Sequence, residues 1–176
     1  MRSLGRVATS TAVATIALFS TASSVSWGQP EHGHAGGHQA AEACSAEFDK
    51  VVSEGRGFGL AFAADQNGYP GPMHVLDLRD QLKLTADQAA KAQALMHAMF
   101  AESKPKSARL LEAEAKLRRL FADRAADDAA VRAAVGEVER ARSEVRLVHL
   151  LAHLKTRDLL TEDQRRIYHE ARWSGR

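Results

Sequence analysis

The sequence contains a single cysteine, Cys44, so no disulfide can form within the chain. It also lacks the alternation of apolar and polar residues that indicates strands, and it has no glycine-rich loop of the kind that binds phosphate. No serine, cysteine or carboxylate constellation suggests catalysis, so we do not expect an enzyme. For Cys44 the alternatives are an intermolecular bridge, a reactive or metal-binding sulfur, or a thiol without a role.

The one long apolar run lies near the start of the chain. Arg2 and Arg6 make a basic segment, residues 7–19 are apolar, and residues 20–26 are mostly small. This order is typical of a secretory signal peptide, and the run is shorter than the roughly 20 residues needed to span a bilayer. We therefore expect residues 1–28 to be a signal peptide and the protein to be periplasmic; the alternative is a buried N-terminal helix. Three cleavage positions are plausible: after Ser24, Ser26 or Gly28.

Loss of the signal peptide would change the charge balance. The whole chain has 24 Lys and Arg against 22 Asp and Glu, and Arg2 and Arg6 would leave with the signal. The mature chain then carries 22 residues of each sign, before histidine is counted. The sequence isoelectric point of about 8.9 therefore gives no reason to expect a nucleic-acid partner.

Residues 29–44 hold His32, His34 and His38 among glycine and alanine. Nothing in this stretch can form an apolar face, so we expect a flexible tail. Imidazole is a good ligand for zinc, copper and nickel, so the tail is either a loose collector of metal or a solvated linker.

Residues 45–176 are expected to form one all-α domain. Apolar residues at three-four spacing predict two long helices. One starts at Ala86, the other ends near Leu159, and residues 124–128 form the turn between them. Pro105 should kink the first helix or unpair one of its turns. The expected seam residues are Ala92, Leu95, Met99, Leu110, Ala113, Leu117 and Leu120 on the first helix, and Val131, Val135, Val138, Val145, Val148 and Ala152 on the second.

Shorter helices are expected around this hairpin. They cover residues 45–54, 59–66, 72–82 and 162–173, with turns at the intervening glycines and prolines. The predicted fold is a long antiparallel helical hairpin with shorter flanking helices. Because so thin a hairpin leaves apolar surface uncovered, we expect a homodimer.

Two segments of the sequence have the same form. Residues 84–88 read LTADQ and residues 160–164 read LTEDQ, and helix-forming sequence follows each. A threonine three residues before a glutamine is a capping box, in which each side chain bonds the backbone amide of the other residue. We therefore expect helices to start after Thr85 and Thr161.

These two segments resemble the LTxxQ signature of the Spy/CpxP superfamily of periplasmic helical proteins. Residues 67–74, NGYPGPMH, are also similar to members of this group, and the resemblance covers roughly residues 55–173. The superfamily includes stress chaperones and the heavy-metal-resistance sensors of the CnrX and ZraP type.

His149 and His153 lie one helical turn apart, so both can reach one metal ion. The resemblance implies a ligand set here, because CnrX-type sensors bind cobalt or nickel through His-x-x-x-Met on the last long helix. With the motifs in register, His149 and His153 fall on those two positions. The alternative is a histidine pair at the edge of a dimer seam, satisfied by water or carboxylates.

The other ligands of those sensors are a glutamate on the preceding long helix and a His-x-x-x-His pair near the start. The glutamate position falls on Met96, beside His97, and the early pair finds only His74, one position out of register. Zinc or copper is therefore as plausible as nickel or cobalt. Met73, Met96 and Met99 stand close to histidines in the sequence, a combination that suits copper(I), although Met96 and Met99 can equally be core residues.

Two functions follow as expectations. In the first, the protein binds a transition-metal ion to sense or buffer it and passes the signal to a membrane-bound partner. In the second, it is an ATP-independent chaperone that holds unfolded client proteins. A set of basic residues on the first long helix could attract acidic client segments: Lys104, Lys106, Arg109, Lys116, Arg118 and Arg119.

Overall fold

The computed structural model describes residues 34–174, and every regular element in that part of the chain is a helix. The elements are α1 (His34–Ser53), α2 (Phe62–Asp65), α3 (Pro72–Asp77), α4 (Ala86–Ala122), α5 (Asp128–Leu159) and α6 (Glu162–Trp173). The predicted all-α fold with two long helices is thereby confirmed. Over these residues, no helix is both long and apolar enough to span a bilayer.

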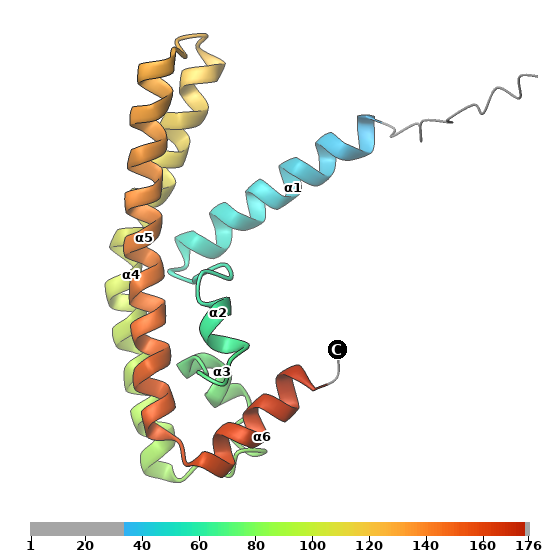
Figure 1. Cartoon of the computed structure of the whole chain (residues 1–176), viewed down its shortest axis with the longest axis vertical. Coiled ribbons are helices and arrows are strands. Elements are labelled where there is room, and N and C mark those ends of the chain that lie inside the picture. Colours follow the sequence, from blue (N-terminus) through green and yellow to red (C-terminus); the bar gives the residue numbers. More distant parts are fainter. Residues whose placement is uncertain (1–33, 175–176) are drawn as a thin grey trace, which may run out of the picture. The chain divides into compact units, whose positions relative to one another are not determined.

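The helices α4 and α5 run side by side as a hairpin (Figure 1). Asp127 caps α5, since its side chain accepts a hydrogen bond from the Ala130 amide at 2.8 Å. The seam between them is apolar as predicted, with two clusters of buried side chains. One consists of Leu110, Val138 and Val145, joined by Val52 of α1, and the other of Met99, Val148 and Ala152. Val135 is the exception, because 42% of its surface is exposed.

Both predicted capping boxes are present. Thr85 accepts from the Gln88 amide at the start of α4, and the Gln88 side chain accepts from the Thr85 amide. Thr161 and Gln164 do the same at the start of α6. The repeated pentapeptide therefore fixes where two of the helices begin.

Pro105 lies inside α4, which continues through it to Ala122. By contrast, α3 ends at Asp77, five residues before the predicted end at Leu82. The chain then makes turns as far as Lys83, whose positive φ of 48° a helix does not allow. The predicted helix over residues 59–66 is reduced to the single turn of α2.

The N-terminal part of the described chain differs from the expectation of a flexible tail. The helix α1 begins at His34 and so includes residues 34–44, while residues 29–33 lie outside the described part. Alanine recurs through this stretch, and its high helix propensity sustains a helix even where residues 39–47 are exposed. The lack of an apolar face in residues 34–44 therefore does not exclude a helix there, because alanine favours the helix locally. Further along, Phe48 and Val52 pack α1 into the core.

Candidate functional site

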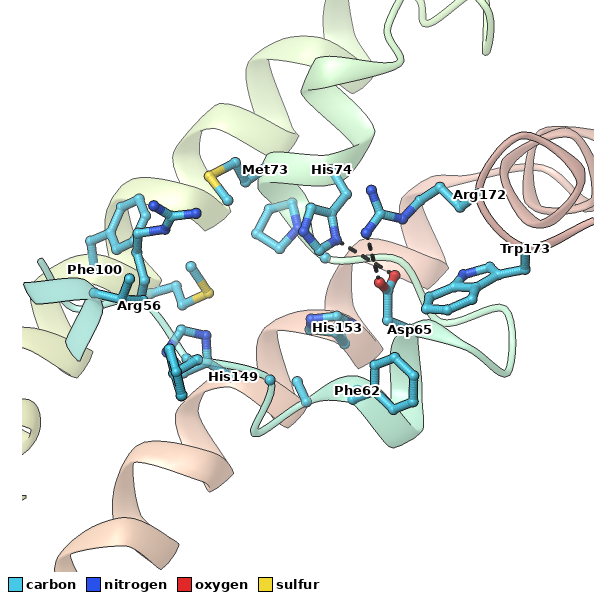
Figure 2. A pocket seen from close by; sticks show the side chains of 18 of the residues that line it. Arg56, Phe62, Asp65, Met73, His74, Phe100, His149, His153, Arg172 and Trp173 are labelled. Atoms are coloured by element: carbon cyan, nitrogen blue, oxygen red, sulfur yellow. Dashed lines mark hydrogen bonds and ion pairs between the residues drawn. The ribbon is translucent and has the colours of Figure 1, made fainter. Parts of the chain in front are cut away.

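A cavity of about 510 Å³ receives side chains from every one of these six helices (Figure 2). Its volume falls within the range of about 300–1,000 Å³ that small-ligand sites occupy. Three of its lining residues are histidines, namely His74 from α3 and His149 and His153 from α5. Aromatic and apolar side chains form much of the remaining wall: Val51, Phe58, Phe62, Phe100, Met73, Met99 and Trp173.

The side chain of His153 is held in one orientation. Its Nδ1 donates a hydrogen bond of 2.6 Å to the carbonyl oxygen of Tyr69, so in the neutral ring Nε2 carries the free lone pair. Burial lowers the pKa of His153, which favours that neutral form. A side chain that is only 6% exposed thus offers one unprotonated nitrogen.

Gly71 leaves room beside that nitrogen. A Cβ at this position would lie 2.8 Å from Nε2 of His153, closer than non-bonded atoms normally approach. The backbone of Gly71 is extended, with φ −78° and ψ 154°, so its conformation does not itself require glycine. The missing methyl group therefore matters for the space around the imidazole.

His149 lies one turn before His153 and is also buried. Its Nε2 is 3.3 Å from the hydroxyl oxygen of Ser103, and the ring also bonds the backbone of Gly55. Burial, together with the nearby His153, lowers the pKa of His149. Gly57 packs on the ring so closely that a Cβ would lie 3.0 Å from it.

His74 faces a buried carboxylate. Its Nδ1 lies 3.5 Å from Oδ1 of Asp65 and 3.4 Å from the hydroxyl of Tyr168. Tyr168 donates a hydrogen bond to Oδ1 of Asp65, and Nη2 of Arg172 lies 3.1 Å from Oδ2 of the same carboxylate. Although burial raises the pKa of Asp65, these hydrogen bonds and the positive charges lower it to about 2. Burial and the bond to Asp65 raise the pKa of Tyr168.

The rings of His74 and His153 lie edge to face in the lining of the cavity. Their centres are 6.3 Å apart, with the planes at 82°. A metal–nitrogen bond is about 2.0–2.1 Å long, so two imidazoles on one ion have centres about 5–6.5 Å apart. The spacing therefore allows one ion between them. Metal-ligating histidines commonly bond a carbonyl or carboxylate through the other nitrogen, as His153 does to Tyr69 and His74 can to Asp65.

The structure brings together three of the five residues predicted from the helical domain. His74, His149 and His153 line the cavity, whereas Met96 and His97 do not. Met96 is half-buried on α4, and His97 is exposed. Of the tail histidines, His34 and His38 lie within α1, and His32 is outside the described residues. Cys44 is exposed on α1.

Several groups in the site were not predicted. Asp65, Tyr168 and Arg172 form the network around His74, and they come from segments over 100 residues apart in the sequence. No periodic pattern links them, so only the folded chain reveals the cluster. A weak signal existed for Met73 and Met99, since both stand near histidines in the sequence.

The donor set fits a metal ion only in part. Within residues 34–174, no three side chains of His, Cys, Asp or Glu converge as a complete metal site would require. The paired imidazoles of His74 and His153, the second hydrogen bond of each ring and the space at Gly71 still suit a bound ion. Any ion here would need ligands beyond these two rings.

The chain matches a model of a known protein family. The family model described as heavy-metal resistance matches residues 57–166, which include α2 to α5 and the start of α6. Neither the curated proteins nor the solved structures give a match.

Proposed function

Because the chain belongs to the heavy-metal-resistance family, we propose that it binds a transition-metal ion in the cavity between His74 and His153 and so senses or buffers that metal. The observation that carries the proposal is the 6.3 Å separation of two imidazole rings whose Nδ1 atoms both face oxygen acceptors. His149 is close enough along α5 to serve as a further ligand after releasing Ser103.

The proposal places this function in the periplasm, because residues 1–28 have the pattern of a secretory signal. A protein exported in this way meets metal ions before the cytoplasm does. Membership in the Spy/CpxP superfamily, with its LTxxQ signature, is part of the same proposal and is supported by the pentapeptides at Leu84 and Leu160. A membrane-bound partner would read the metal-loaded state.

Calorimetry on the mature protein tests the proposal. We expect about one tightly bound ion per protomer, and we expect His74→Ala and His153→Ala each to abolish that event. His97→Ala is the matched control, because His97 is exposed on α4 and lies outside the cavity. Alanine at His32, His34 and His38 should remove only weaker binding. If His153→Ala titrates like the parent, the proposed site is wrong.

A second function is favoured by one exposed apolar stripe. Leu147, Leu151 and Leu154 follow each other at helical spacing on α5, with 56%, 45% and 42% of their surfaces exposed. Such a stripe suits an ATP-independent chaperone that holds unfolded chains. The basic residues of α4 give less support, because several of them are already ion-paired: Lys106, Arg109, Lys116 and Arg118.

The same stripe could instead be covered by a second copy in a homodimer. Light scattering gives the mass, and an aggregation assay with an unfolded client gives the chaperone activity. Under the chaperone proposal, Leu147→Gln with Leu151→Gln should abolish suppression of aggregation. Phe121→Gln is the control: Phe121 is 59% exposed elsewhere on the hairpin, and its substitution should leave suppression of aggregation unchanged. Equal suppression by both variants would reject a role for the stripe.

A further inference from the structure

Two methionines line the same cavity. Met73 precedes His74 at the start of α3 and is half-buried, while Met99 lies on α4 and is 7% exposed. Figure 2 shows Met73 on the same side of the cavity as His74. Met96, one turn before Met99 on the same helix, does not line the cavity. Within residues 34–174, two methionines therefore line the cavity together with the histidines and one does not.

Oxygen ligands are scarce around these histidines. Of the two carboxylates that line the cavity, Asp65 is already engaged by His74, Tyr168 and Arg172. The other, Glu47, belongs to the exposed part of α1. No three His, Cys, Asp or Glu side chains within the described part of the chain converge on one point. His149 is already hydrogen-bonded to Ser103 and to the backbone of Gly55, so the uncommitted groups that can complete a shell begun by His74 and His153 are thioethers.

This donor set selects among metals. Thioether sulfur is a soft ligand that favours copper(I), whereas carboxylate and water favour harder ions. We infer that the cavity takes a soft monovalent ion, copper(I), with the thioethers of Met73 and Met99 completing a shell begun by His74 and His153. The inference rests on the proposed function, because it names the metal for that same site.

The competing explanation is that these methionines only fill space. Met99 does contact Val148 and Ala152 in a buried cluster, which is ordinary core packing. Met73, however, is half-buried at the cavity and belongs to neither cluster of the α4–α5 seam. It is also absent from the third buried cluster of the described residues, which consists of Val75, Leu82, Ala92, Leu160 and Tyr168. A substitution that keeps volume and removes sulfur separates the two explanations, because leucine for methionine costs little in packing.

The test measures metal affinity in the mature chain carrying Cys44→Ser, since the exposed thiol of Cys44 would itself bind copper(I). The probes are copper(I), by competition with a chromogenic chelator, silver(I) as a redox-inert analogue, and zinc(II). Met73→Leu and Met99→Leu should each weaken copper(I) and silver(I) binding by more than about tenfold, since even second-shell changes cost about 10–100-fold. Met96→Leu is the matched control and should bind like the parent.

Each outcome decides between the claims. Tight copper(I) binding that falls in Met73→Leu and Met99→Leu, but not in Met96→Leu, supports the inference. Tight zinc(II) binding at the histidines with no effect of either methionine overturns the inference and leaves the proposed function standing. Absence of tight binding for all three ions overturns the inference, and absence of tight nickel(II) and cobalt(II) binding as well overturns the proposed function. X-ray absorption of the copper(I)-loaded parent must also show sulfur ligands, and a shell of nitrogen alone overturns the inference even if a leucine variant fails to fold.

Discussion

Gln88 and Gln164 hydrogen-bond each other in both directions. The side-chain Nε2 of Gln88 donates to Oε1 of Gln164 at 2.8 Å, and Nε2 of Gln164 donates to Oε1 of Gln88 at 3.0 Å. Nε2 of Gln88 also donates to the carbonyl oxygen of Leu159, and Nε2 of Gln164 to that of Leu82. Each Oε1 in addition accepts from the backbone N–H of the threonine in its own capping box. Both side-chain amides are thus fully satisfied, and the pair ties the start of α4 to the start of α6.

Breaking this pair should destabilise the fold. Gln88→Ala or Gln164→Ala leaves one donor and one acceptor position of the other side-chain amide without a partner, which costs about 1–3 kcal/mol in the free energy of unfolding. The double variant should lose less than the sum of the two single losses, because the second substitution removes an already damaged interaction. Denaturant unfolding measures these values. Gln93 is exposed on α4, so Gln93→Ala is the control and should change the free energy of unfolding little. If the losses of the two single variants simply add in the double variant, the pairing is contradicted.

The two capping boxes could be predicted from the sequence, but the contact between them could not. Each capping box could be read from five adjacent residues, because its hydrogen bonds span three positions. The contact between the two boxes joins residues 76 positions apart, and nothing in either pentapeptide specifies it. The same limit applies to the site. The spacing of His149 and His153 placed them on one helix face, but the approach of His74 and the cluster of Asp65, Tyr168 and Arg172 depend on how the short helices pack.

The buried histidines should make the metal-free protein sensitive to mild acid. Burial lowers the pKa of His149 and His153 below the ordinary 6.5, so the unfolded chain takes up protons first as pH falls below that value. The stability of the folded state therefore decreases from pH 6.5 downward. Melting temperatures measured with a chelator should fall over this range in the parent and His97→Gln. They should fall less in the double variant that carries His149→Gln and His153→Gln. If the melting temperature of the double variant depends on pH as steeply as that of the parent, these two histidines are not the cause.

Asp65 should give a second, more acidic transition. Its pKa is lowered from 3.8 to about 2, so its contribution is present above pH 3.8 and is lost as pH falls toward 2. For a side chain that is only 7% exposed, this shift corresponds to about 2 kcal/mol. Asp65→Asn should be less stable than the parent at neutral pH and should lose less stability between pH 4 and about 2. Asp77→Asn, at the exposed end of α3, is the control and should keep the slope of the parent.

The most direct test of the proposed metal site is the affinity of the Gly71→Ala variant. The backbone at Gly71 accommodates alanine, but the added methyl group would occupy space 2.8 Å from Nε2 of His153 while every histidine remains. Gly136→Ala, inside α5 with only Arg140 nearby, is the matched control and should bind metal like the parent. We expect Gly71→Ala to bind metal more than about tenfold more weakly, with its helix content unchanged. Parental affinity in Gly71→Ala would contradict an ion bound at His153.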